Sequence, residues 1–150
     1  SEVSYTTAEV TRLPSDVKVI CGIVVHDENP EAYILDRESG TMAYEDLGDV
    51  NVAWDGFRER QAKEMGRIFI GTYIPARDVQ MEMLADKKLP GAKGHVISSI
   101  SLPEDGRFTY YFGSGWDRNP VTPFRNLDLW AQYLKRFSVQ EKSPLSVKIR

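Results

Sequence analysis

The sequence is poor in the residues that build disulfides and zinc sites. Its 150 residues include one cysteine, Cys21, and two histidines, His26 and His95. A lone cysteine excludes an internal disulfide, and this supply is too small for a structural zinc site made of cysteine and histidine alone. We therefore expect no metal ligands in the functional site.

Several signatures of enzymes, nucleic-acid-binding proteins and membrane proteins are also missing. The chain has no GxxxxGK[ST] or GxGxxG segment for phosphates, no HExxH or CxxC pair for metals, and no GxSxG nucleophile turn. The formal net charge is −3, without a block of like charge, which argues against a nucleic-acid partner. No apolar run approaches the roughly 20 residues of a membrane span. We expect no cofactor, no nucleic-acid partner and no membrane span.

What the chain has is the pattern of a strand-rich globular domain. Apolar residues make up 41% of it and charged residues 27%, which is ordinary for a globular protein. Alternating or β-branched runs predict strands at residues 17–26, 33–36, 42–45, 66–74, 79–84, 95–102 and 107–113. We expect residues 1–150 to form one β-rich domain, with a short helical turn at 7–13, a loop at 48–56, and irregular chain or a short helix at 57–64.

Two of these strands carry further predictions. Residues 17–26 (VKVICGIVVH) are apolar on both faces, which is typical of a central strand covered on both sides. The strands at 95–102 and 107–113 flank the turn sequence Pro-Glu-Asp-Gly, and this arrangement predicts an antiparallel hairpin.

One amphipathic helix is predicted near the C-terminus, at residues 126–140. Asn126 is a good N-cap, and Ser143-Pro144 ends the helix. Its apolar stripe consists of Leu127, Trp130, Ala131, Leu134 and Phe137. Residues 145–149 then alternate apolar and polar side chains, as a half-buried strand does. One helix among many strands favours a mostly β fold, and an antiparallel β-sandwich is the simplest arrangement.

His95 is the first candidate site residue. It opens a predicted strand after a glycine-rich loop, where a side chain can act on a ligand as an acid or base. The alternative is a structural histidine at a strand end. His26, which closes the strand at 17–26, has the same two interpretations, and the structural one is favoured there.

The segment YYFGSGWD, residues 110–117, is the most distinctive in the chain. Alternation sends Tyr110 to one face of the sheet and Tyr111 to the other. Trp116 is predicted in a glycine-flanked loop, where an indole can stack on the apolar face of a sugar, and Asp117 can accept hydrogen bonds from its hydroxyls. The alternative is that Trp116 fills the end of the sandwich.

The C-terminal stretch resembles the domain-of-unknown-function family 4861. The resemblance lies in FTYYFGSGWD, in the helical LWAQYLKRF and in the final SPLSVKI. It implies a β-sandwich similar to that of galactose mutarotase, of which this chain would be a half or a fragment from the C-terminal part. It also implies periplasmic or secreted proteins of bacteria that use polysaccharides.

Together these observations predict a carbohydrate-active domain that acts on or binds uronic-acid-type polysaccharide fragments. Its site would combine His95 and Asp117 as catalytic groups with Tyr110, Tyr111 and Trp116 as binding groups. The alternatives are a noncatalytic carbohydrate-binding or accessory module, and a structural fragment of a larger enzyme. A fragment would leave an apolar face or sheet edge for a second copy of the chain or a missing N-terminal segment.

Overall fold

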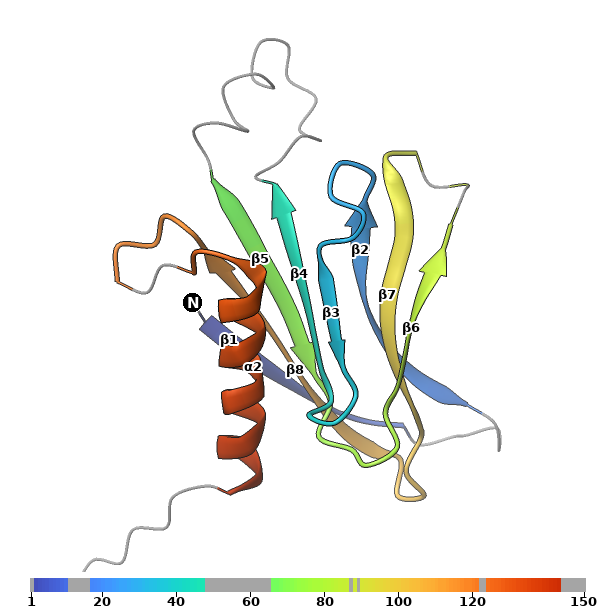
Figure 1. The fold of residues 1–150 in the computed structure, drawn as a ribbon. Helices are drawn as coiled ribbons and strands as arrows, with labels where there is room; N and C mark the ends of the chain where they lie inside the picture. Colours follow the sequence, from blue (N-terminus) through green and yellow to red (C-terminus); the bar gives the residue numbers. More distant parts are fainter. Residues whose placement is uncertain are drawn as a thin grey trace, which may run out of the picture.

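The described part of the chain folds into two antiparallel sheets that face each other and one long helix (Figure 1). The computed structural model describes residues 2–10, 17–47, 66–86, 88, 90–121 and 124–143. The expected mostly β, antiparallel sandwich with one C-terminal helix is confirmed within these residues. The predicted strand at 145–149 and the predictions for 48–64 lie outside them.

The two sheets differ in width. The larger has the order β1 (Glu2–Glu9), β8 (Arg107–Trp116), β5 (Arg67–Tyr73), β4 (Thr41–Leu47) and β3 (Tyr33–Asp36). The smaller has the order β2 (Lys18–His26), β7 (Ala92–Ser101) and β6 (Gln80–Ala85). β2 lies against β4 and β5, so β8 and β1 extend past the edge of the smaller sheet.

The main core lies between the sheets. Alternate residues of each strand point inward, including Ile23 and Val25 of β2, Met42 and Tyr44 of β4, and Val96 of β7. Fully burying a side chain of this size stabilises the fold by roughly 1.5–3 kcal/mol. The face toward the other sheet is called the inner face below.

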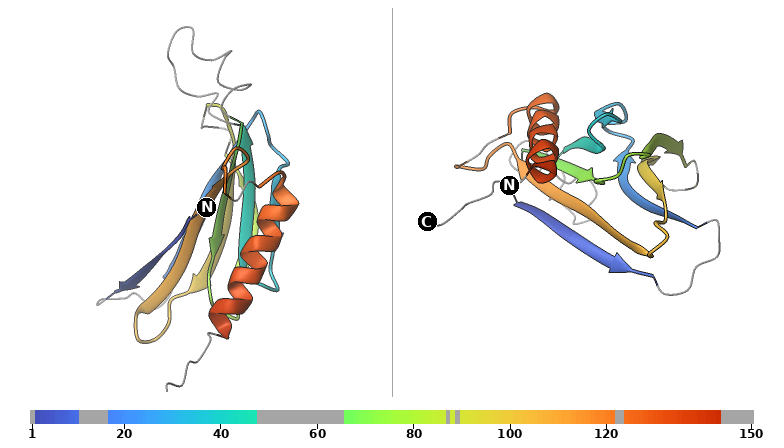
Figure 2. Two further views of the ribbon diagram at one scale, coloured as in Figure 1. Left: turned by 90° about the vertical axis from the view of Figure 1, so that its left-hand side faces the viewer. Right: turned by 90° about the horizontal axis from the view of Figure 1, so that it is seen from below.

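Helix α2 (Leu127–Lys142) covers the outer face of the larger sheet, over β3, β4 and β5 (Figures 1 and 2). Its predicted N-cap is confirmed, because the side chain of Asn126 accepts a hydrogen bond from the Leu129 N–H at 2.9 Å. Trp130 and Leu134 of the predicted stripe are buried with Phe69 of β5 in a second hydrophobic cluster.

Three sequence-based expectations about strands are wrong. Residues 2–9 form β1 where a helical turn was expected from residue 7, because they pair with β8 along their whole length. The expected hairpin is absent: β7 pairs with β2 and β6, and β8 pairs with β1 and β5. The turn between them, with Gly106 at a φ of 70°, instead carries the chain from one sheet to the other. β2 is an edge strand with one exposed face, not a central strand covered on both sides.

Candidate functional site

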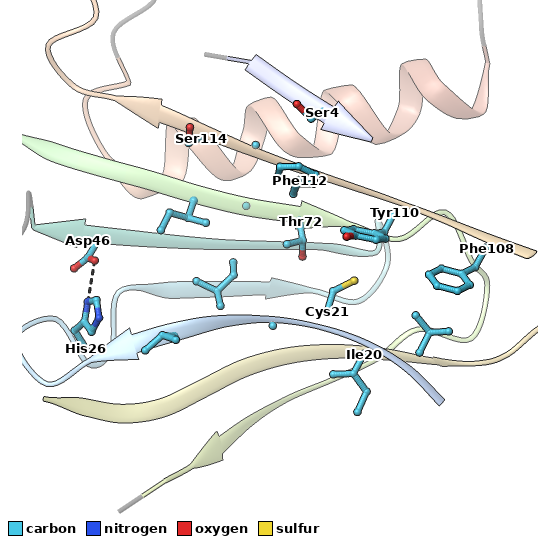
Figure 3. Close-up of a pocket in the computed structure, with 17 residues that line it drawn as sticks. Ser4, Ile20, Cys21, His26, Asp46, Thr72, Phe108, Tyr110, Phe112 and Ser114 are labelled. Carbon is cyan, nitrogen blue, oxygen red and sulfur yellow. Dashed lines mark hydrogen bonds and ion pairs between the residues drawn. The ribbon is translucent and has the colours of Figure 1, made fainter. Parts of the chain in front are cut away.

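An open groove of about 1000 Å³ runs along the side where the larger sheet extends past the smaller one (Figure 3). One wall is β2. The opposite wall and the floor are the inner faces of β8 and β5, with one residue each from β1 and β4. The unequal width of the two sheets therefore creates the groove.

The floor of the groove carries a row of aromatic side chains. Phe108, Tyr110 and Phe112 are alternate residues of β8 and so project from the same face (Figure 3). The rings of Tyr110 and Phe112 are 6.1 Å apart between centroids. Phe108 and Tyr110 also pack against the core, whereas Phe112 is 46% exposed. The row presents an apolar surface that a ligand can reach.

Polar groups lie beside this row. Ser4 of β1, Thr72 of β5 and Ser114 of β8 all line the groove. Thr72 is directly opposite Phe112, and its buried Oγ1 makes no hydrogen bond to any described residue. A buried hydroxyl without a partner is costly, so a ligand that hydrogen-bonds to Thr72 would gain from the contact.

The wall formed by β2 presents its backbone to the groove. Six consecutive residues, 19–24, line it, so both faces of the strand and the edge between them border the space. Among the described strands, β2 is hydrogen-bonded only to β7, and its other edge faces the groove. Such an edge offers backbone N–H and C=O groups for hydrogen bonding.

A histidine–aspartate pair stands at one end of the groove. Nδ1 of His26, the last residue of β2, is 2.9 Å from Oδ2 of Asp46 on β4 (Figure 3). Both side chains are partly exposed and both line the groove. A carboxylate at this distance holds the imidazole in one orientation, which leaves the other ring nitrogen for a further contact.

Tyr44 holds the backbone of His26 in place beside Asp46. It is fully buried, and its hydroxyl accepts a hydrogen bond from the backbone N–H of His26 at 3.0 Å. Burial raises the pKa of Tyr44 to about 12, and the charges of Asp46 and Glu28 act in the same direction. The phenol therefore stays protonated near neutral pH and anchors the end of β2 beside Asp46.

The structure distributes the five predicted site residues over four places. Tyr110 lies in the groove, as described. Tyr111 points to the outer face, where its ring contacts Tyr73 and Phe137 and its hydroxyl donates to Glu141. His95 is partly buried on β7 of the smaller sheet. It lies opposite Val24 of β2 and Leu84 of β6, which are both exposed on the outer face.

Asp117 follows β8 and binds the start of β5. Its Oδ1 accepts a hydrogen bond from the Arg67 N–H at 2.9 Å, and its Oδ2 is 3.7 Å from Arg67 Nε. These contacts give Asp117 a structural role where β8 ends and β5 begins. The structure thus places the two predicted catalytic residues, His95 and Asp117, on different sheets.

Trp116 is the last residue of β8, and the expectation that it lies in a loop is wrong. The strand continues through Gly115, whose missing side chain leaves room for Phe124, just before α2: a Cβ at Gly115 would lie 2.6 Å from Phe124 Cδ2. Trp116 pairs with Ile68, which pairs with Asp46, so the three lie in one row across the sheet. Trp116 is 42% exposed.

A second, smaller hollow of about 520 Å³ lies where β8 ends and β5 begins. It is lined by Arg67, Asp117, Arg118, Asn119, Pro120 and Arg125. Arg67 also binds Glu45 through Nη1 at 3.1 Å. With three arginines and one aspartate in its lining, this hollow favours an anionic group.

Sequence reasoning missed the histidine–aspartate pair. It weighed His26 as mainly structural and did not consider Asp46. The signal for Asp46 was present in β4, because Met42, Tyr44 and Asp46 alternate and so share the inner face. A carboxylate at the next inward-facing position after alternating buried apolar residues is a candidate site residue. The contact to His26 joins strands of different sheets, which local patterns do not encode.

The described part of the chain also lacks a metal cluster and a membrane-spanning helix. In that part of the chain, no group of three or more histidine, cysteine, aspartate or glutamate side chains is arranged to hold a metal ion. No helix there is long and apolar enough to cross a membrane.

Comparison with known proteins finds one family. The model of a domain of unknown function, DUF4861, matches residues 1–147. The match therefore reaches well beyond the C-terminal motifs that carry the resemblance. No curated protein and no solved structure matches the chain.

Proposed function

For this chain, which belongs to the DUF4861 family, we propose a carbohydrate-active function in which the groove along β2 and β8 binds uronic-acid-type oligosaccharides. The observation that carries the proposal is the row of Phe108, Tyr110 and Phe112 on the floor of an open groove. The ligand would enter from the open side of the sandwich and lie between this row and the edge of β2.

The chemistry of the groove suits a sugar. A pyranose ring has an apolar C–H face and a rim of hydroxyls, and aromatic rings cover the first while hydroxyl and backbone groups bind the second. Ligand sites commonly combine an apolar lining with a few placed polar groups. Among the described residues, Thr72 supplies a hydroxyl without a hydrogen-bond partner, and β2 supplies a backbone edge without a neighbouring strand.

The acidic character of the proposed ligand has two supports. One is the resemblance to proteins associated with polysaccharide use. The other is the hollow lined by Arg67, Arg118 and Arg125, which begins directly after Trp116 at the end of β8. A uronic acid carries one carboxylate per sugar unit, so a ligand that extends along β8 would bring a negative charge toward these arginines.

A second candidate function is catalysis at the end of the groove. His26 and Asp46 form a pair that can hold and transfer a proton, and both border the space in which the sugar would lie. In this version Asp46 is a positioning residue and His26 is the group that contacts the ligand. Without such a step, the domain would be a noncatalytic binding module.

Finer features of the proposal rest on the resemblance. We propose that the sandwich is of the galactose-mutarotase type and that the chain is the C-terminal part of a longer periplasmic or secreted protein. In the fragment alternative, a preceding segment or a second copy of the chain covers the groove. That occupant would compete with a glycan for Phe112 and the edge of β2.

A calorimetric screen of acidic and neutral oligosaccharides tests the proposal. The wild-type chain should bind acidic members, and Phe112→Ala should weaken this binding roughly threefold to tenfold, because aromatic contacts are worth about 0.5–1.5 kcal/mol. Tyr5→Ala is the matched control, since Tyr5 is 70% exposed on the same sheet but points to the opposite face. Equal loss in both variants would contradict the groove as the site.

Product analysis of the same mixtures separates the two candidate functions. His26→Asn and Asp46→Asn should keep glycan binding and lose product formation if the pair is catalytic. If the wild-type chain binds glycans without making product, the binding module is the correct function. If it binds none and light scattering shows a dimer, the fragment alternative replaces the proposal.

A further inference from the structure

Thr72 lines the groove with a buried hydroxyl that has no hydrogen-bond partner in the described part of the chain. We infer that Thr72 is a specificity-determining residue, which binds a neutral hydroxyl of the sugar unit that stacks on Phe112. This inference rests on the proposed function. It adds the residue that selects the sugar unit and the direction in which the carboxylate of that unit points.

The Thr72 hydroxyl differs from most buried hydroxyls, which are hydrogen-bonded in proteins. Oγ of Ser39 and Oγ1 of Thr41 show the usual arrangement, because they bond to each other at 2.8 Å. Among the described residues, three buried side-chain oxygen atoms lack a partner, those of Thr72, Tyr73 and Ser98. Of these three, Thr72 lines the groove, so it is the one that a ligand in the groove can satisfy.

The packing of β5 does not require a hydroxyl at this position. Thr72 is 7% exposed. Valine has the same branched shape and suits a strand, and it would not bury a polar group without a partner. The hydroxyl therefore lowers the stability of the unliganded fold and becomes favourable when a ligand bonds to it.

Thr72 lies beside the aromatic ring on which the sugar would stack. Phe112 pairs with Thr72 of β5 on one side and with Ser4 of β1 on the other, so the three form one row across the inner face (Figure 3). Neighbouring strands are about 4.8 Å apart. A pyranose ring that covers Phe112 therefore has rim hydroxyls within reach of buried Thr72 on one side and of exposed Ser4 on the other.

The lining of the groove favours a sugar hydroxyl over a carboxylate at Thr72. No lysine or arginine is among the described residues that line it, and the carboxylate among them is that of Asp46. A sugar carboxylate pressed against Thr72 would lose hydration without gaining an opposite charge. A sugar hydroxyl can both donate to the threonine hydroxyl and accept from it. The carboxylate of this sugar unit therefore points away from β5, toward the open side of the groove.

Calorimetric titration with a hexameric oligouronate tests the inference. Thr72→Val keeps the shape of the side chain and should weaken the Kd roughly twofold to tenfold, as expected for one hydrogen bond between neutral groups. Thr72→Ser keeps a hydroxyl and should retain most of the affinity. Without ligand, the melting temperature of Thr72→Val should lie above that of the wild type, because a buried group without a partner is removed. Binding and stability should thus change in opposite directions.

Ser98→Ala is the matched control. Ser98 also buries a hydroxyl without a partner in the described part of the chain, but it does not line the groove, so its removal should leave the Kd unchanged. A Thr72→Val protein that binds as tightly as the wild type overturns the inference and leaves the groove as the site. A lower melting temperature of Thr72→Val also overturns it, because the hydroxyl would then stabilise the fold. A loss of roughly a hundredfold would assign the sugar carboxylate to Thr72 and refute the neutral contact. A wild-type chain that binds no oligouronate overturns the proposed function itself.

Discussion

Replacement of Trp130 with alanine is the strictest test of how α2 is held on the larger sheet. The side chain has an exposure of 0%, and its rings lie 4.8 Å from Phe124 and 5.4 Å from Tyr133 between centroids. Its indole N–H donates to the carbonyl oxygen of Ile70 at 3.0 Å. Removing a buried tryptophan costs about 3–5 kcal/mol. Loss of this hydrogen bond adds to the packing cost and places the expected loss in the upper half of that range.

Urea unfolding followed by far-ultraviolet circular dichroism measures this loss without relying on tryptophan fluorescence. Val139→Ala is the control, because Val139 is exposed on the same helix. The control should change the free energy of unfolding by less than about 0.5 kcal/mol. A loss below about 1 kcal/mol for Trp130→Ala would mean that the apolar stripe of α2 is not seated on the sheet.

Three further predictions concern glycine packing, alkaline pH and thiol reactivity. Gly115→Ala should destabilise the fold by about 1–3 kcal/mol in urea unfolding, because the new Cβ meets the ring of Phe124; an unchanged midpoint would contradict close packing there. The hydrogen bond to Glu141 raises the pKa of Tyr111 from 10.0 to about 12, so the folded state keeps a proton that the unfolded state loses. The free energy of unfolding should therefore fall as the pH rises from 10.0 to about 12, and it should fall less steeply in Tyr111→Phe than in the wild type. Equal slopes in the two proteins would refute the assignment. Burial raises the pKa of the Cys21 thiol, so alkylation at mildly alkaline pH should be slow until urea unfolds the chain; rapid labelling of the folded protein would show that the groove exposes the thiol.

Much of the fold could be predicted because its signals are local. The strand periods and the cap and stripe of α2 depend on residues close together in sequence, and these predictions are confirmed. β1 was missed because its sequence, EVSYTTAE, lacks an apolar face that marks a strand. It becomes a strand by pairing with β8, which is about 100 residues away, as in the contact between Thr7 and Thr109.

The remaining differences come from tertiary contacts. The turn after β7 has the sequence of a hairpin turn, yet it joins two sheets, because β2 and β6 already occupy both sides of β7. Gly113 and Gly115 suggested a loop, but Gly115 is a strand residue that makes room for Phe124. Glycine marks both turns and close packing, and the sequence of one chain does not separate the two.

For the candidate site too, the local features could be predicted from the sequence and the tertiary contacts could not. Alternation along β8 predicted that Tyr110 and Tyr111 face opposite sides, and the structure places Tyr110 in the groove and Tyr111 against α2. The contact between His26 and Asp46 forms only when the two sheets meet. A groove that arises from the unequal width of two sheets cannot be predicted from the period of any one strand.

The central claim, that the groove along β2 and β8 binds an acidic glycan, is tested most directly by locating the ligand on the protein. An oligouronate hexamer would be titrated into the isotopically labelled chain, and backbone amide shifts would be followed by NMR. We predict shifts that concentrate in residues 19–26 of β2 and 108–116 of β8. Shifts concentrated on the outer face around Tyr5 and α2, or no shifts at all, would contradict the account.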